Sequence, residues 1–505
     1  MSTEIRKSSV CLNKEIFSGS GQTVCQTDVI VPDAMPDALK VLMADGRAVV
    51  ESTVLGKGKI GVRGRVDCDL LYVPENARGV KSIKAQMPFS FSEDAAKADE
   101  NMMPCVSAEV SHIEYQLVNS RKISVKAVVE IKICIIGKEE IKYVSSIEGD
   151  EAEIKEKKLK GKNNIVCCRR NFAVNEKIPV SEKAEKLLKC DAEIKSKDIK
   201  IINNKVVAKG ELEVSALYCA EGEMPDFVEA TLPFTEILDA EGISDKQLCR
   251  VDYFIKETGA EIVDTDEGKA VSCSIVISAN ICSDEEVEFT AVNDVYGTKT
   301  ILKPQTKSID TSETADKVFA NVEIREIVTL ENEMPQIEKV YALNVKPYIN
   351  ECTAGSAGVK ADGTAVCSVI YISGKEDAYV QSAQYSVPFG TVFGGSYDIN
   401  SIVKAEAELV KAEYSLSGKD IEIRASIKIN AEVLKNHKND IVTDITEEEE
   451  VCGDRPAMVL YFVQRGDTPW EIAKKYHSKI SEIEQINKLE SGEIKEGMML
   501  LIPKK

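Results

Sequence analysis

The 505-residue sequence has few of the residues on which metal sites and enzymes most often depend. It contains three histidines, His112, His437 and His477, and none of its 15 cysteines forms a Cys-x-x-Cys pair. Zinc sites usually combine closely spaced cysteine and histidine ligands. We therefore expect no metal site and no cofactor, and we interpret most of the cysteines as small buried apolar residues in a reducing compartment.

Catalytic motifs are also absent from the sequence. No phosphate-binding Gly-x-x-x-x-Gly-Lys-Ser/Thr loop, no Gly-x-Ser-x-Gly elbow and no His-Glu-x-x-His pair occurs. No histidine or carboxylate pair recurs at matching positions along the chain. We therefore expect no catalytic residues and predict that the protein is not an enzyme.

Positive charge and long apolar runs are scarce as well. The 84 acidic residues outnumber the 64 basic ones and give a formal net charge of −20. Nucleic acids and anionic membranes bind cationic surfaces, so the sequence predicts neither as a direct partner. No stretch approaches the roughly 18 apolar residues of a membrane span, and the first residues do not resemble a secretory signal. We expect a cytoplasmic protein without direct membrane insertion, whose partners are proteins.

The main feature that the sequence does contain is a repeat in three copies. The segments GRVDCDLLY from Gly64, GELEVSALY from Gly210 and GTAVCSVIY from Gly363 each run from a glycine to a tyrosine, and a Pro-Phe pair begins 15 to 17 residues after each tyrosine. Apolar and polar residues alternate through each segment, which is typical of a long strand with one buried face. A period of about 150 residues indicates duplicated whole domains.

Each copy closes with a second alternating strand, which begins at Lys122, Lys269 or Lys419. The glycine of the first strand lies on its apolar face, where glycine usually marks a bulge or the close approach of another backbone. An Ile-Pro or Met-Pro step precedes each strand pair, and we expect one short helix after it. The predicted fold is mainly β, with three tandem antiparallel sandwich or open-barrel domains at residues 20–145, 165–285 and 316–440.

The end of the chain has a different pattern. Residues 441–457 include the run TEEEE, which we interpret as part of a solvated acidic linker. Residues 458–505 then show an alternating strand from Met458, two short segments with helical spacing and a strand from Met498 to Ile502. Thr468 is placed to cap the first helix. The sequence therefore predicts a small α+β unit in the order βααβ.

Two family resemblances follow from these patterns. The recurring strand from glycine to tyrosine and the Pro-Phe step resemble the SPOCS domains of clostridial sporulation proteins, over roughly residues 20–440. The C-terminal unit resembles the LysM domain, through residues that include Tyr461, Gly466, Trp470, Asn487 and Pro503. The LysM resemblance implies a shallow groove for glycans that contain N-acetylglucosamine, between two loops. The residues that this resemblance places in the groove are Gly466, Asp467, Thr468, Asn487 and Ile494.

The unit departs from the LysM pattern at Phe462, where a polar residue is usual. Because Tyr461 and Val463 face the helices, Phe462 points away from them. The outer face of the two-stranded sheet is then apolar, and it carries Met458, Leu460, Phe462, Met499 and Leu501. Such patches mark protein interfaces more often than sugar sites. Three occupants of this face stay open: an external protein, the third β domain of the same chain, or a glycan.

Trp470 is the only tryptophan in the chain and lies beside the apolar stripe of its helix. Two interpretations of this residue stay open. It is either a half-buried packing residue or an anchor in a protein interface, where tryptophan often dominates the binding energy. We include Trp470 with the outer-face residues in the candidate protein-binding site.

Repeated SPOCS-like domains followed by a LysM unit resemble the family of clostridial spore coat morphogenetic proteins. This resemblance implies a place in the mother cell, at the surface of the forespore. It also implies that the LysM unit binds the coat scaffold ATPase, stage IV sporulation protein A, and that other coat proteins are further partners. The alternative function is a peptidoglycan-binding protein of the spore cortex or cell wall, against which the missing export signal argues.

Overall fold

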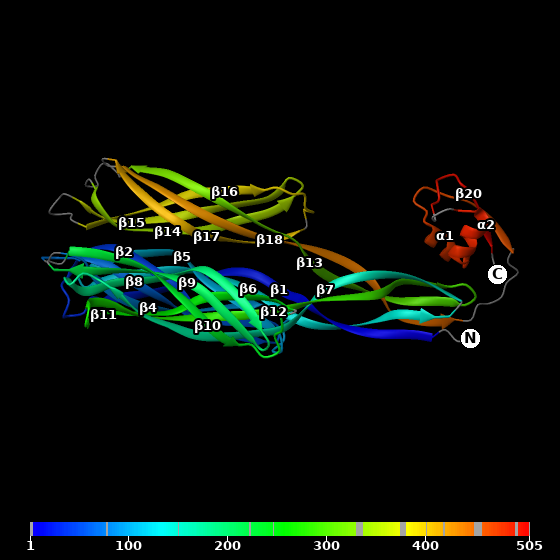
Figure 1. Ribbon diagram of the computed structural model, residues 1–505, viewed down its shortest axis with the longest axis horizontal. Coiled ribbons are helices and arrows are strands. Elements are labelled where there is room, and N and C mark those ends of the chain that lie inside the picture. The colour runs from blue at the N-terminus through cyan, green and yellow to red at the C-terminus, as the bar shows by residue number, and fades with distance from the viewer. Residues whose placement is uncertain are drawn as a thin grey trace.

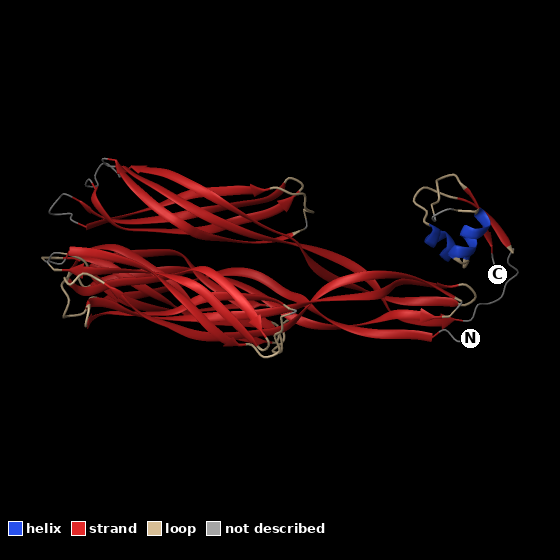
Figure 2. Cartoon of the chain, in the orientation of Figure 1, coloured by secondary structure: helices blue, strands red, loops and turns tan. Residues whose placement is uncertain are grey.

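The computed structural model describes residues 4–76, 79–149, 151–221, 224–245, 247–329, 337–373, 380–399, 401–417, 420–448, 457–489 and 493–503. Figure 1 shows long strands gathered in one elongated body, with a small helical unit near the end that holds the N-terminus. Figure 2 shows that strands dominate the body and that the helices belong to the small unit. The mainly β fold predicted from the sequence is confirmed.

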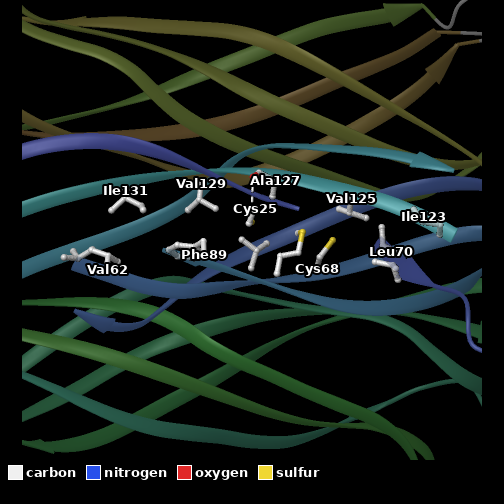
Figure 3. Packing of buried hydrophobic residues seen from close by; sticks show 14 of the residues in the cluster. Cys25, Val62, Cys68, Leu70, Phe89, Ile123, Val125, Ala127, Val129 and Ile131 are labelled. Atoms are coloured by element: carbon white, nitrogen blue, oxygen red, sulfur yellow. Dashed lines mark hydrogen bonds between the residues drawn. The ribbon is translucent and has the colours of Figure 1, made fainter. Parts of the chain in front are cut away.

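The first domain is a sandwich of two antiparallel three-stranded sheets, in the orders β1-β6-β5 and β2-β3-β4. Its strands are β1 (Glu4–Ile30), β2 (Ala38–Gly56), β3 (Lys59–Pro74), β4 (Lys81–Asp94), β5 (Met103–Asn119) and β6 (Lys122–Glu148). The apolar positions of β3 and β6 alternate as the sequence predicts, and they meet in one core. Figure 3 shows Cys25 and Cys68 packed there among Val62, Leu70 and Phe89.

The second and third domains repeat this arrangement. In the second, the sheets have the orders β11-β12-β7 and β10-β9-β8, and in the third β13-β18-β17 and β14-β15-β16. The strands of the second domain are β7 (Ala152–Pro179), β8 (Ala184–Ile202), β9 (Lys205–Ala220), β10 (Met224–Asp239), β11 (Leu248–Thr265) and β12 (Gly268–Gly297). Those of the third are β13 (Ile301–Thr329), β14 (Ile337–Gly355), β15 (Gly358–Ser373), β16 (Val380–Phe393), β17 (Ile402–Ser417) and β18 (Asp420–Glu448).

The repeated glycine lies where another backbone comes close, as the sequence predicts. A Cβ atom at Gly64 would lie 2.3 Å from the carbonyl oxygen of Val49, and one at Gly363 would lie 2.5 Å from that of Tyr348. The partner strand also shifts its register beside each of these glycines. Both expected features, the bulge and the close approach, are therefore present in the first and third copies.

The helix expected after the proline step is wrong in the first two copies. In the first two copies the segment after the proline leads into β2 or β8, and the Met-Pro step of the third copy lies outside the described residues. Val41 and Leu187 pair with Tyr72 and Tyr218 of the neighbouring strand. Pairing with that strand satisfies the backbone groups and buries one face of the segment, so tertiary contacts override the local helical preference.

The long strands extend beyond the sandwiches and run together toward the N-terminal end of the body (Figure 1). Two apolar clusters hold them together, and we call this region the stalk. Its residues are Val10, Leu12, Ile141, Tyr143, Leu159, Phe289, Ala291, Ile309 and Ile441 in one cluster, and Val144, Val292, Val295, Leu302, Val442 and Ile445 in the other. Each cluster contains residues of all three domains.

The acidic linker begins later than the sequence predicts. Residues 441–448 belong to β18 instead, because Ile441 and Val442 are fully buried against strands of the other domains. The strands also run past the expected domain limits: β1 begins at Glu4 and β7 at Ala152. Residues 449–456 of the expected linker lie outside the described residues.

The C-terminal unit has the predicted order of elements. It consists of β19 (Met458–Phe462), α1 (Pro469–Tyr476), α2 (Ile480–Asn487) and β20 (Met499–Pro503), and β19 pairs with β20 in an antiparallel sheet. Its core contains Val463, Ile472, Ala473 and Leu500. Neither helix has the length and apolar character of a membrane span, and among the described residues no other helix does.

Candidate functional site

The loop before α1 is held by its own side chains. The Thr468 hydroxyl accepts a hydrogen bond from the Glu471 backbone N–H at 3.2 Å, and the Glu471 carboxylate accepts one from the Thr468 N–H at 3.3 Å. This reciprocal capping box satisfies two donors at the start of the helix. The Asp467 carboxylate accepts hydrogen bonds from the Tyr461 hydroxyl at 2.7 Å and the Gln464 N–H at 2.8 Å.

Asn487 fastens the end of α2 to β20. Its amide nitrogen donates to the carbonyl oxygens of Ile483 and Leu501, and its amide oxygen accepts from the Leu501 N–H at 2.7 Å. Ile494 packs against the core of the unit. Of the residues predicted to line a glycan groove, Asp467, Thr468, Asn487 and Ile494 therefore have side chains that hold the unit together. Gly466 is exposed, with a φ of 94° that favours glycine.

Helix α1 docks on β12 of the second domain. The indole N–H of Trp470 donates to Asp294 at 2.8 Å, and the Trp470 ring lies edge-on to Tyr296 with centroids 5.1 Å apart. The Lys474 ammonium contacts both oxygens of the Asp294 carboxylate, at 2.6 and 2.8 Å. Burial by itself would raise the pKa of Asp294, but the hydrogen bonds from Lys474 and Trp470 and the charge of Lys474 hold it below its usual range.

The turn between the two helices adds two more contacts to the same strand. The Tyr296 hydroxyl donates to the carbonyl oxygen of Ser478 at 2.8 Å, and the His477 ring lies 2.8 Å from the carbonyl oxygen of Gly297. Tyr296 is 2% exposed and belongs to the core of the C-terminal unit. The unit and the tip of β12 therefore share one small hydrophobic core.

These contacts combine the two interpretations of Trp470. The side chain is half-buried and anchors an interface, but that interface lies within the chain. The helix makes the contact, and it makes it with the second domain, whereas the sequence considered docking of the sheet on the third domain. Asp294 and Tyr296 form the body side of this interface, and no local sequence pattern indicates them because they are about 180 residues from their partners.

The outer face of the sheet turns away from the core. Met458, Leu460, Phe462 and Met499 are each 52–54% exposed, whereas Leu501 is partly buried. Leu460 pairs with Leu501 and Phe462 with Met499, so apolar side chains from both strands adjoin one another. We call these five residues the outer sheet face. The structure therefore brings the predicted sheet residues together and places Trp470 apart from them, against β12.

Comparison with known protein families identifies the modules of the chain. Residues 37–118 and 183–263 match the SPOCS domain of SipL, and residues 461–503 match the LysM domain. The first two matches cover β2 to β5 and β8 to β11, and β14 to β17 of the third domain have the same order of strands. No curated protein and no solved structure matches the chain. Both family resemblances drawn from the sequence are confirmed, and this domain content fits a sporulation-related protein with a LysM domain of the glycan-binding type.

Proposed function

We propose that this chain of SPOCS and LysM domains is a non-enzymatic spore coat assembly protein. Its LysM domain binds the coat scaffold ATPase, stage IV sporulation protein A, and helps to localise the coat at the forespore surface in the mother cell. The observation that carries the proposal is the outer sheet face, with four apolar side chains each about half exposed on one small domain. Contiguous apolar side chains of this kind mark protein interfaces.

The position of the LysM domain supports this proposal. Because α1 docks on β12, the domain is held at the end of the stalk while its outer sheet face stays exposed. Fully burying one large apolar side chain contributes roughly 1.5–3 kcal/mol, so a few such residues supply a useful share of a binding energy. The three β domains then offer further surfaces to other coat proteins, and linked modules raise each other's effective concentration.

A capture experiment with purified proteins tests the proposal. We expect the full chain to bind the scaffold ATPase, and the variant that combines Leu460→Lys with Phe462→Lys to bind it at least about tenfold more weakly, because two lysines place charge in an apolar contact. The matched control is Phe319→Lys on β13, which changes a side chain that is 71% exposed elsewhere on the body. Undiminished binding by the double variant would contradict the proposed surface.

A truncation gives a second test of the same proposal. A chain that ends near Glu447 lacks the LysM domain and should no longer capture the ATPase. Retention of binding by this truncated chain would assign the contact to the β domains instead.

The LysM match supports one alternative, a peptidoglycan-binding protein of the spore cortex or cell wall. Co-sedimentation of the full chain with insoluble peptidoglycan or chitin distinguishes the two functions. Saturable sedimentation that the Phe462→Lys change leaves intact, together with no capture of the ATPase, would favour the glycan function. We expect the chain to stay in the supernatant.

A further inference from the structure

Three cysteines from three different strands meet between the first and second domains. Cys105 lies on β5, Cys167 on β7 and Cys282 on β12, and their sulfur atoms all lie within 4.8 Å of one another. The sulfur atoms of Cys167 and Cys282 are 3.2 Å apart. All three side chains are partly buried. We call these three residues the thiol cluster.

The strand register explains how the fold assembles the thiol cluster. Cys167 and Cys282 are direct cross-strand partners in the second domain. Cys282 follows the core residue Ile281, so its side chain lies on the opposite face of the sheet from the core. In the first domain, Cys105 pairs with Cys134, which lies between core residues of β6 and so has the same outward placement. The cluster therefore forms where the outer faces of two sheets meet.

Two cations lie near the thiol cluster, and one of them, Arg250, also pairs with Asp252 at 3.1 Å. Arg250 on β11 is the register partner of Cys282 on its other side. Arg250 and Lys404, the latter on β17 of the third domain, act electrostatically on Cys105. These cations lie beside sulfur atoms that would carry negative charge once a metal is bound, since cysteine binds metals as the thiolate. Cys25, Cys68 and Cys367, in contrast, lie in the apolar cores of the first and third domains.

We propose that Cys105, Cys167 and Cys282 form a binding site for a thiophilic divalent cation, with Zn²⁺ as the natural occupant. Zn²⁺ binds thiolate sulfur at about 2.3 Å, which places tetrahedral sulfur ligands about 3.8 Å apart. The observed spacing needs only small side-chain adjustments to reach this geometry. The three thiols release their protons to solvent on binding, and water completes the coordination, as it does in sites with three protein ligands.

The chemistry of the ligands selects the class of metal. Three sulfur ligands without oxygen donors suit soft or borderline ions and disfavour Mg²⁺ and Ca²⁺. The site would also join the first domain to the second, since Cys105 comes from one and its two partners from the other. The sequence predicted no metal because none of the three cysteines has a second cysteine or a histidine at ligand spacing. Strand pairing and domain packing bring the three cysteines together although they are far apart in the sequence.

Titration of the reduced, chelator-treated full chain with Co²⁺ tests the site, since the absorption spectrum of Co²⁺ depends on the type and geometry of its ligands. We expect one Co²⁺ per chain, with the near-ultraviolet sulfur-to-cobalt absorption and strong visible bands of a tetrahedral thiolate site, and displacement by added Zn²⁺. Cys105→Ser and Cys282→Ser should each weaken binding on the order of tenfold or more. The matched control is Cys352→Ser in the third domain, also partly buried, which should bind as the unchanged chain does.

A second measurement keeps the test independent of whether a variant folds. In the unchanged chain, Zn²⁺ should protect Cys105, Cys167 and Cys282 from alkylation, as read by mass spectrometry of their peptides, while the exposed Cys11 stays reactive. Zn²⁺ should also raise the melting temperature of the unchanged chain and of Cys352→Ser. The absence of saturable uptake, or equal reactivity of the three thiols with and without Zn²⁺, would overturn the proposal.

Discussion

The side chain of Lys189 is buried where the three β domains meet. It is 7% exposed, and its ammonium group contacts the carboxylates of Asp191 and Asp45, the latter at 2.6 Å. Lys346 of the third domain contacts the other oxygen of Asp45 at 2.7 Å. Burial by itself would lower the pKa of Lys189 and raise that of Asp45. The opposite charges outweigh this effect, so they hold the pKa of Lys189 above and that of Asp45 below its usual range.

Removal of the lysine charge should be costly. We expect Lys189→Met to lower the free energy of unfolding by about 3–5 kcal/mol, because it leaves the buried Asp45 with Lys346 alone and removes the ammonium group that contacts Asp191. The control is Arg6→Met, which removes an ion pair with Glu148 in which both side chains are more than half exposed. That change should cost less than about 1 kcal/mol. Denaturant unfolding of the two variants measures the difference.

The same variant tests how the free energy of unfolding depends on pH. A carboxyl group with a lowered pKa stabilises the fold above its unfolded pKa of about 4, and this contribution is lost as the pH falls through its folded pKa. The unchanged chain should therefore lose stability below about pH 4, and Lys189→Met should lose less. If the two chains differ in free energy of unfolding by the same amount at pH 7 and at pH 2.5, the assigned role of Asp45 is contradicted.

The repeated glycine gives another test at the scale of one residue. Gly64→Ala should lower the free energy of unfolding by about 1–3 kcal/mol, because its Cβ would lie 2.3 Å from the Val49 carbonyl oxygen, which is closer than van der Waals contact. Gly355→Ala is the control, since a Cβ at that position meets nothing within 4 Å. A Gly64→Ala chain as stable as the control would mean that the strand relaxes without cost.

At the scale of the element, α1 links the LysM domain to the body through few groups. Asp294 accepts hydrogen bonds from both Trp470 and Lys474, and hydrogen bonds to a charged group contribute roughly 1.5–3 kcal/mol each. The register shift between Val292 and Asp294 lies at this point of β12. The outer sheet face belongs to another surface of the same domain, so the docking and the proposed partner binding use different elements.

The single tryptophan makes this docking directly measurable. Asp294→Ala should shift the Trp470 emission to longer wavelength, because loss of the contact exposes the indole ring to water. Asp444→Ala, which removes an exposed partner of Lys7 in the stalk, should leave the emission unchanged. The unchanged chain should show the same shift as the pH falls below about 4, because Asp294 has a lowered pKa. Emission that stays constant in both experiments would contradict the docked arrangement.

At the scale of the whole molecule, apolar clusters join all three domains. One of them combines corresponding residues of β2 and β3, β8 and β9, and β14 and β15 with Val80, just before β4, and Val380, at the start of β16. Its buried members are Leu42, Leu71, Val80, Leu188, Leu217, Cys219, Tyr341, Ile370, Ile372 and Val380. The stalk adds two further shared clusters. The three β domains therefore pack into one body, because each domain buries part of its apolar surface against the others.

This shared packing predicts cooperative unfolding. We expect calorimetry of the full chain to show one transition for the three β domains together. Ile370→Asp, which places a charge in the cluster between domains, should lower the midpoint of that whole transition. Ile399→Asp is the control, since this side chain is 83% exposed. Separate transitions, of which Ile370→Asp moves only one, would show that the domains unfold independently.

Much of the local structure could be predicted from the sequence. The alternation around Gly64 and Gly363 defined the strands, their buried faces and the close backbone approach. The pattern from Met458 to Ile502 defined the βααβ unit and its exposed apolar face. These predictions succeeded because the alternation and spacing of apolar residues record which side of each element is buried.

The tertiary structure decided what lies against each face. The segments after the proline steps of the first two copies, expected as helices, lead into strands, and β18 extends into the expected linker. Trp470 packs against Asp294 and Tyr296. The tertiary structure also brought Cys105 to Cys167 and Cys282. A periodic pattern shows that a side chain is buried or exposed, but it does not name the contact. That choice depends on strand pairing and domain packing between residues far apart in the chain, whose proximity no local spacing records.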